Sequence, residues 1–327
     1  EMKRFYTAIL LLLIGCYFTP LYRVYAGADA VTLKQNLKEG QSFNQLDLIE
    51  FQVRIGAGET KVEINSHIGM GYVCRVEKST PAGDWLARMQ IHSLYYEGPG
   101  MLGQINIYDS TDPFALPDQN TIVFSYLVGD EMTIEFDPAG QVKEIKFSDA
   151  YFDKLIKYFR SNKMKIQRDS LEKMMIETMK AQLNKDENSP EQGAFPPQPV
   201  TVGETWEKEI TTDNSGVRLT QKAVYTLTKR CNGIAYIELD TKLVEVDPGA
   251  DSGVQYENFS GGMKGTIEIA EDLGWICAYD LKLKFMGEIR QTDQSINEES
   301  TRQPTDVKEQ AGFVLEGSLI RKPFTGS

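Results

Sequence analysis

The chain has 327 residues, of which 41% are hydrophobic and 25% are charged. These fractions are typical of a globular protein with one large or two medium domains, and they exclude a disordered, collagenous or coiled-coil chain. A single apolar run of membrane-relevant length excludes a polytopic membrane protein. The formal net charge of −12 would repel a nucleic-acid backbone, so we expect no DNA or RNA partner.

Residues 1–28 have the pattern of an export signal. A basic pair precedes an apolar stretch, residues 5–18, that is too short for a comfortable membrane span. Two processing routes stay open. A small-x-small pattern would allow cleavage before Asp29, whereas a lipobox-like sequence would make Cys16 an acylated first residue. Either route exports the protein to the periplasm or the cell surface, and only lipidation of Cys16 would attach it to a membrane, as an outer-membrane anchor.

The segment 29–147 predicts a first antiparallel β domain. Apolar and polar residues alternate along it, as where Ile49, Phe51 and Val53 alternate with polar neighbours. Such one-sided alternation is typical of antiparallel strands that bury one face. Turn signals such as the Gly-Ala-Gly at 56–58 separate the runs, so we expect long meandering hairpins.

The segment 148–184 changes to the period of an amphipathic helix. One apolar face predicts a helix over residues 149–161, and its members are Phe152, Leu155, Ile156 and Phe159. A second stripe predicts a helix over residues 169–184, and its members are Leu171, Met175, Met179 and Leu183, with Met174 at the border. We expect this helix pair to cover the concave face of the first sheet, with the apolar side chains of the first helix pointing inward.

The second half of the chain is again rich in strands. Residues 185–199 contain four prolines and predict a stiff extended linker. After this linker, the segment 200–327 returns to period-2 alternation, for example at 223–227 and 281–285, and predicts a second antiparallel β domain.

Two local sequence matches relate these β domains. The turn around Gly40 resembles the turn around Gly203, and the strand at 133–136 resembles the strand at 266–269. We therefore predict a mainly β (α+β) fold of two curved antiparallel sheets, related by duplication, with the helix pair between the halves.

Three cysteines lie beyond the predicted export signal. Cys231 and Cys277 lie in the same half of the chain and could form a disulfide. The alternative, in which these two and Cys74 are small buried residues with free thiols, stays open. Because no Cys-x-x-Cys spacing is present, the sequence predicts neither a thioredoxin-like site nor a zinc knuckle.

The sequence carries no catalytic motif. It contains no Gly-x-Ser-x-Gly elbow, no Gly-rich phosphate loop ending in Lys and Ser or Thr, and no His-Glu-x-x-His. His67 and His92 fall on the polar faces of their predicted strands, with no third residue to complete a triad or a metal site. We therefore predict a non-enzymatic protein without a cofactor or a metal.

Four segments together resemble an uncharacterised family of exported bacterial β-rich proteins with a domain of unknown function. They are LKQNLKEG at 33–40, YDSTDP at 108–113, the strand and turn at 129–140, and PVTVGETW at 199–206. The resemblance spans nearly the whole mature chain, and its last motif is the most specific. It implies no catalytic or binding residue. At the level of the fold, a curved antiparallel sheet capped by helices is similar to the periplasmic carriers of lipoproteins and lipids.

Two functions are compatible with these patterns. In the first, an exported envelope protein binds a lipid or another apolar ligand between sheet and helices; the residues that would line this site are Phe152, Leu155, Ile156, Phe159, Met174, Met175 and Met179. In the second, the protein is a structural or protein-interaction module of the envelope without a small ligand. The two differ in whether the interface between sheet and helices is hollow or filled by side chains.

Overall fold

The computed structural model describes ten stretches of the chain. They are residues 30–57, 60–80, 84–99, 105–117, 121–137, 142–184, 193–214, 217–247, 254–291 and 310–323. The predicted export signal and Cys16 lie outside these stretches. None of the helices within them is long and apolar enough to cross a membrane.

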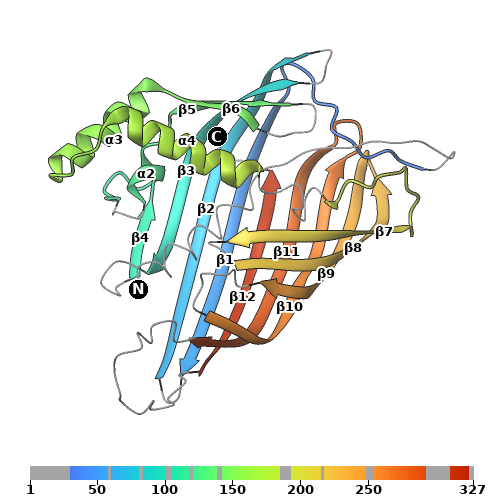
Figure 1. The fold of residues 1–327 in the computed structure, drawn as a ribbon. Coiled ribbons are helices and arrows are strands. Elements are labelled where there is room, and N and C mark those ends of the chain that lie inside the picture. The colour runs from blue at the N-terminus through green and yellow to red at the C-terminus, as the bar shows by residue number, and fades with distance from the viewer. Residues whose placement is uncertain are drawn as a thin grey trace, which may run out of the picture.

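The strands form one antiparallel sheet of 12 strands (Figure 1). Its first half contains β1 (Ser42–Ala57), β2 (Thr60–Ser79), β3 (Trp85–Pro99), β4 (Ile105–Asp109), β5 (Glu131–Phe136) and β6 (Val142–Phe147). Its second half contains β7 (Thr205–Asn214), β8 (Val217–Cys231), β9 (Ile234–Asp247), β10 (Val254–Ala270), β11 (Trp275–Gln291) and β12 (Gln310–Pro323). The helices are α2 (Ile122–Ser125), α3 (Asp149–Ser161) and α4 (Arg168–Asn184).

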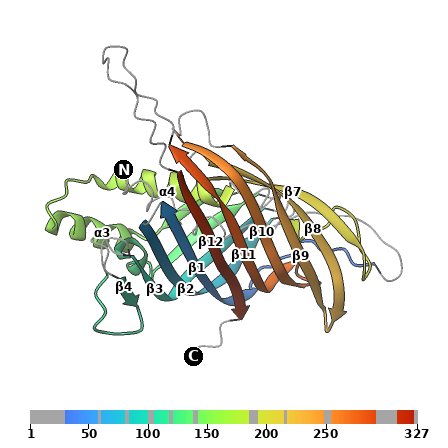
Figure 2. The ribbon, with the colours of Figure 1, turned by 90° about the horizontal axis from the view of Figure 1, so that it is seen from below.

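The order of the strands corrects the prediction of two separate, duplicated sheets. The sheet runs β6-β5-β3-β2-β1-β12-β11-β10-β9-β8-β7, and β4 pairs with β3 outside this path. The first and last strands join the halves, because β1 pairs with β12 from Gln45 opposite Pro323 to Gly56 opposite Gly312. Alternation shows that a strand buries one face, but it does not show which strand lies beside it. Within the described residues the end strands β6 and β7 do not pair, so this strongly curved sheet is open (Figure 2).

The helices form where the apolar periodicity predicts them. The predicted bounds of α3 are confirmed, and α4 begins one residue earlier than predicted. Ser148 caps α3, because its Oγ accepts a hydrogen bond from the backbone N–H of Tyr151 at 3.1 Å. Both helices lie across one face of the first half of the sheet (Figure 1).

Two large hydrophobic cores and one small cluster, formed by Leu94, Tyr96 and Tyr108, stabilise this sheet. The helix-covered core joins α3 and α4 to β2, β3, β5 and β6, and its most buried members include Tyr72, Ala87, Ile145, Phe152 and Leu155. The segment-covered core lies mainly on β1 and β7–β12, and its most buried members include Ile210, Tyr225, Ile237, Ile267 and Leu281. Short irregular segments close this second core, where the first core uses helices.

The predicted linker provides part of this cover. Ala194 and Phe195 are only 0% and 3% exposed and belong to the segment-covered core. Trp206 donates a hydrogen bond from Nε1 to the carbonyl of Gly193 at 2.7 Å, and Val31 and Val200 exchange backbone hydrogen bonds of 2.8 and 3.1 Å. The described part of 185–199 is therefore packed into the fold and does not act as a free spacer.

A buried ion pair marks the boundary between the two cores. Arg321 on β12 donates from Nε and Nη2 to the two carboxylate oxygens of Asp47 on β1, at 2.7 and 2.9 Å. The hydroxyl of Tyr72 donates to the same carboxylate at 3.1 Å, and the guanidinium lies 4.9 Å from the ring centroid of Tyr279. Asp47 and Arg321 are 0% and 8% exposed, so this two-point contact is shielded from water and selects one register of β1 against β12.

The turns at Gly40 and Gly203 share one hydrogen-bond pattern. Both glycines have positive φ, at 85° and 94°, as the third residue of a type II turn requires. Their N–H groups donate to the carbonyls of Val76 and Leu227, at 2.8 and 2.7 Å. The match between these sequences therefore reflects one local structure, although the two halves do not form separate sheets.

Candidate functional site

The residues predicted to bind an apolar ligand lie where α3 and α4 meet the sheet. Six of the seven are buried or partly buried in the helix-covered core; they are Phe152, Leu155, Ile156, Phe159, Met175 and Met179. The seventh, Met174, is 58% exposed and faces away from this group. The structure therefore brings six predicted residues together and separates one from them.

Aromatic side chains fill the interface between helices and sheet. The ring of Phe147 stacks on Tyr151, with centroids 5.2 Å apart, and meets Phe152 edge to face at 5.6 Å. The hydroxyl of Tyr151 donates to the carbonyl of Val123 at 3.2 Å, and burial raises its pKa well above the ordinary value. Tyr151 and Leu155 are both 0% exposed, which is typical of a packed core and not of a ligand cleft.

The predicted disulfide does not form. Cys231 lies at the end of β8 and Cys277 lies on β11, and β9 and β10 separate them in the sheet. Three strand spacings are about 14 Å, beyond the ~7 Å that a disulfide allows between Cα atoms. All three described cysteines are free thiols, and burial raises the pKa of the Cys74 thiol to about 12, which makes it unreactive.

Four large apolar side chains are exposed on β4 and in the loop that follows it. We call this set the apolar edge; its members, with their exposed fractions, are Ile105 (70%), Ile107 (63%), Phe114 (88%) and Leu116 (86%). β4 pairs on one side with β3, from Tyr95 opposite Asp109 to Pro99 opposite Ile105, and so lies at the margin of the sheet.

Hydrogen bonds hold the loop of the apolar edge in one shape. Asp109 accepts from the backbone N–H and the hydroxyl of Thr111, at 2.8 and 2.7 Å, and Asp112 accepts from the backbone N–H of Phe114 at 2.9 Å. Ser110 ties the loop to β3, because its Oγ accepts from the N–H of Leu94 at 2.7 Å. The loop therefore presents its apolar side chains to water from a built scaffold.

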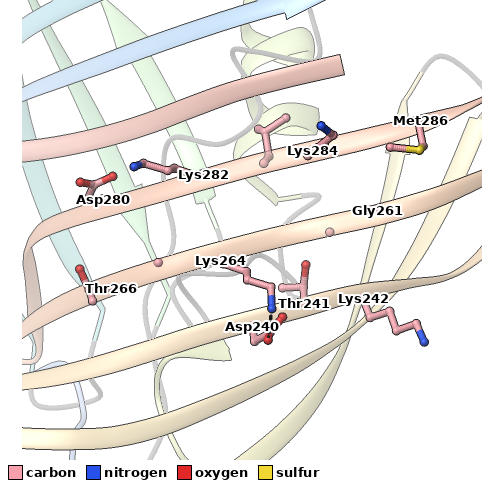
Figure 3. Close-up of a pocket in the computed structure, with 13 residues that line it drawn as sticks. Asp240, Thr241, Lys242, Gly261, Lys264, Thr266, Asp280, Lys282, Lys284 and Met286 are labelled. Carbon is pink, nitrogen blue, oxygen red and sulfur yellow. Dashed lines mark hydrogen bonds and ion pairs between the residues drawn. The ribbon is translucent and has the colours of Figure 1, made fainter. Parts of the chain in front are cut away.

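A groove of about 910 Å³ lies on the solvent-exposed face of β9, β10 and β11 (Figure 3). Its charged side chains come from all three strands; they are Asp240, Lys242, Lys264, Asp280, Lys282 and Lys284. Lys264 forms an ion pair with Asp240, with 2.6 Å between Nζ and Oδ2. Leu283 and Met286 add apolar surface, and the glycines of β10 leave its centre free of side chains. This combination can hold an anionic group.

Groups that could hold a metal are absent from the described part of the chain: no three His, Cys, Asp or Glu side chains gather there. His92 is exposed, and the Nδ1 of His67 lies 3.4 Å from a carboxylate oxygen of Glu97 at the surface. Both histidines thus lie on the polar side of their strands, as the alternation predicts.

Sequence reasoning missed the apolar edge and the groove. Ile105 and Ile107 share one parity of a short strand, which is the pattern of a half-buried strand, but the margin of the sheet leaves this parity in water. The large apolar residues at 114 and 116 lie between prolines, in a segment that the sequence marks as a turn. Large apolar residues in a turn were the available signal of an exposed apolar surface. Each groove lysine occupies a polar position of its alternating strand, which is ordinary for a surface residue. Only the register of β9, β10 and β11 brings these lysines together.

Two solved structures are similar to this chain at a low level. The COG4313 outer membrane channel from Pseudomonas putida F1 matches with a TM-score of 0.20 and 9% identity, over 92% of this chain and 100% of that chain. A DUF1329 family protein from Desulfovibrio piger ATCC 29098 matches with a TM-score of 0.13 and 8% identity, over 87% of this chain and 88% of that chain. Scores this low give no basis for transferring a fold or a function. No curated protein matches the sequence.

A family model covers more than half of the chain. It is described as a family of unknown function (DUF6263) and matches residues 87–276. The match runs from within β3 to the start of β11, so it includes the apolar edge, both helices and part of the groove. The chain belongs to the family of unknown function DUF6263.

Proposed function

We propose that this protein is a non-enzymatic, exported protein of the cell envelope that acts as a protein-interaction module. The observation that carries the proposal is the apolar edge, whose four large apolar side chains are 63–88% exposed. Large apolar side chains that stay exposed on an ordered strand and loop are typical of interaction sites, because removing apolar surface from water is energetically favourable. The export pattern of residues 1–28 supports the location in the envelope.

The filled helix-covered core favours this function over an internal apolar ligand. A carrier needs space between sheet and helices, whereas Phe152 and Leu155 are 1% and 0% exposed and pack directly on the sheet. Binding at this interface would require displacing core side chains. A partner that docks from outside needs no such displacement.

The charges around the apolar edge favour a protein partner over an anionic lipid surface. The stretch 105–117 contains Asp109 and Asp112 and no Lys or Arg. Anionic headgroups attract basic segments, so the two carboxylates and the net charge of −12 oppose adsorption to such a surface. A protein with an apolar groove rimmed by basic residues is the complementary partner.

Site-specific cross-linking in the native host tests this function. A photo-reactive amino acid replaces Phe114 in one version and the exposed Lys78 on β2 in a control version. We expect a discrete cross-linked protein band from position 114 and none from position 78. With the photo-reactive residue at position 107 instead, we expect the same band from the otherwise unchanged protein. The double variant Phe114→Ser/Leu116→Ser should lose this band from position 107 without a change in melting temperature.

Two results would contradict the proposed function. One is the absence of a discrete band from position 114. The other is a band of equal intensity from position 78. A band at twice the mass of the chain would identify the partner as a second copy, which sedimentation of the purified protein can check.

A further inference from the structure

The groove lies where two neighbouring strands separate. β9 and β10 pair only from Asp240 opposite Lys264 to Ile234 opposite Ala270. Beyond this point β9 continues beside β8, and the first part of β10 continues beside β11. The lining residues surround the point of separation, so the groove is a feature of the sheet topology and not an accident of surface side chains (Figure 3).

Backbone contacts fix the floor at this point. Gly261 has a φ of 143°, and a Cβ on Gly262 would collide with the carbonyl of Thr241, so β10 passes β9 too closely for side chains. The hydroxyl of Thr241 accepts from the N–H of Met263 and donates to Gln221, both at 2.7 Å. The point of separation is thus held by buried hydrogen bonds and leaves a floor without side chains.

Lysines face lysines across two pairs of strands beside this floor. Lys264 on β10 lies directly opposite Lys282 on β11, and Lys222 on β8 lies directly opposite Lys242 on β9. Like charges in directly opposed positions destabilise a sheet. This protein has 47 acidic residues against 35 basic ones, so a shortage of carboxylates does not explain the arrangement.

One lysine of each pair is neutralised and the other is not. Lys264 pairs with Asp240 at 2.6 Å, and Lys222 pairs with Glu207 at 2.8 Å. For Lys242 and Lys282, the described parts of the chain supply no ion pair, and both lysines line the groove. Lys284 also lines the groove and pairs with Glu316 at 2.6 Å, so the positive charges of Lys242 and Lys282 stand against the single negative charge of Asp280. The groove thus retains a net positive charge on an acidic protein.

We infer that this groove is a binding site for a ligand that carries phosphate groups, with Lys242 and Lys282 as its charged contacts. Ammonium groups bind phosphate as point charges, and a groove of about 910 Å³ holds more than one phosphate. Met286 is 41% exposed and can contact a carbon frame attached to the phosphates. This site is independent of the proposed docking at the apolar edge.

Two probes separate the possible sources of the phosphate groups. Inorganic tripolyphosphate, measured by isothermal titration calorimetry at low salt, represents a free phosphate ligand. Vesicles of phosphatidylglycerol with phosphatidylcholine, measured by flotation against pure phosphatidylcholine, represent a lipid headgroup. We expect tripolyphosphate to bind and its affinity to fall as salt is added, because the contacts are exposed charges.

Variants test whether the groove is responsible. We expect Lys242→Gln/Lys282→Gln to weaken the binding of tripolyphosphate by about tenfold, because two charge contacts are lost. The control Lys61→Gln/Lys78→Gln removes the same charge from exposed positions on β2 and should leave affinity within about twofold. Asp280→Asn removes a negative charge from the groove and should strengthen binding, which gives a variant with the opposite sign.

Binding of vesicles but not of tripolyphosphate, sensitive to the same variants, would support the site and identify a lipid headgroup. Equal weakening by the groove variant and by the control would overturn the inference, since binding would then follow net charge alone. Failure of both probes to bind would also overturn it.

Discussion

The two cores of this sheet are covered in different ways. Two amphipathic helices cover the first, and their apolar residues repeat with a helical period. Irregular segments around Val31, Phe195 and Val200 cover the second, and these segments have no period. A cover made of regular structure can therefore be predicted from a sequence, whereas a cover made of irregular chain resembles a linker in its sequence.

The two cores also depend on a shared joint. Asp47 on β1 and Arg321 on β12 form an ion pair between the two cores. The pairing of β1 with β12 joins the two halves into one sheet. We therefore expect variants of the ion pair, of the irregular cover and of the helical cover to change the free energy of unfolding by different amounts.

Breaking the joint should have the largest effect. We expect Asp47→Ala to lower the free energy of unfolding by about 3–5 kcal/mol, because it leaves the buried guanidinium of Arg321 without its carboxylate. Urea unfolding measures this loss. The double variant Asp47→Leu/Arg321→Met removes both charges and should recover most of it. A single variant as stable as the wild type would contradict the role of the pair.

Removing the irregular cover should cost nearly as much. Phe195→Ala deletes a side chain that is 3% exposed, and we expect a loss of about 3–5 kcal/mol in urea unfolding. The matched control is Val202→Ala, a nearby apolar side chain that is 53% exposed and should cost little. If Phe195 belonged to a free linker, the two variants would be equally stable.

The helical cover allows a sharper contrast within one set of predicted ligand residues. Leu155→Ala should cost about 2–5 kcal/mol, because the side chain is fully buried, whereas Met174→Ala should stay within about 0.5 kcal/mol. Thermal or urea unfolding distinguishes them. A small loss in the free energy of unfolding for Leu155→Ala, combined with reduced uptake of an apolar dye, would indicate a loosely packed cleft. That result would support the hypothesis of an internal apolar ligand.

The smallest expected effect depends on pH and concerns a partly buried ion pair in the second half of the chain. Arg230 donates to both carboxylate oxygens of Glu271, at 2.8 and 2.7 Å, and this contact lowers the pKa of Glu271. A lowered pKa in the folded state stabilises the fold above the ordinary pKa of glutamate, and the stabilisation is lost as the pH falls through the folded-state value. We expect Arg230→Gln to cost about 0.5–1 kcal/mol at neutral pH, and less as the solution is acidified.

A surface ion pair serves as the control for this pH dependence. Lys222 and Glu207 are paired at 2.8 Å with more than half of each side chain exposed. Lys222→Gln should therefore change the free energy of unfolding only slightly at any pH. A cost of Arg230→Gln that stays constant in acid would show that packing, and not the charge on Glu271, is responsible.

Some residues of the candidate sites can be placed from local spacing, and others only from the folded chain. The interior placement of Phe152, Leu155 and Ile156 follows from their spacing and is confirmed, but the spacing does not distinguish a packed core from a ligand cleft. Met174 lies at the border of its stripe, and the structure leaves it in water. The groove charges Lys242 and Lys282 come from different strands, so no local pattern could bring them together.

The features that depend on residues a few positions apart can be predicted from the sequence. These are the alternating strands, the helix at 149–161 with its cap at Ser148, and the type II turns at Gly40 and Gly203. Only the folded chain shows that β1 lies beside β12, that Phe195 is buried and that Lys264 lies opposite Lys282 at the groove. The reason is physical: periodicity records which face of a segment avoids water, whereas strand neighbours are selected by contacts between distant residues, such as Asp47 and Arg321, 274 positions apart.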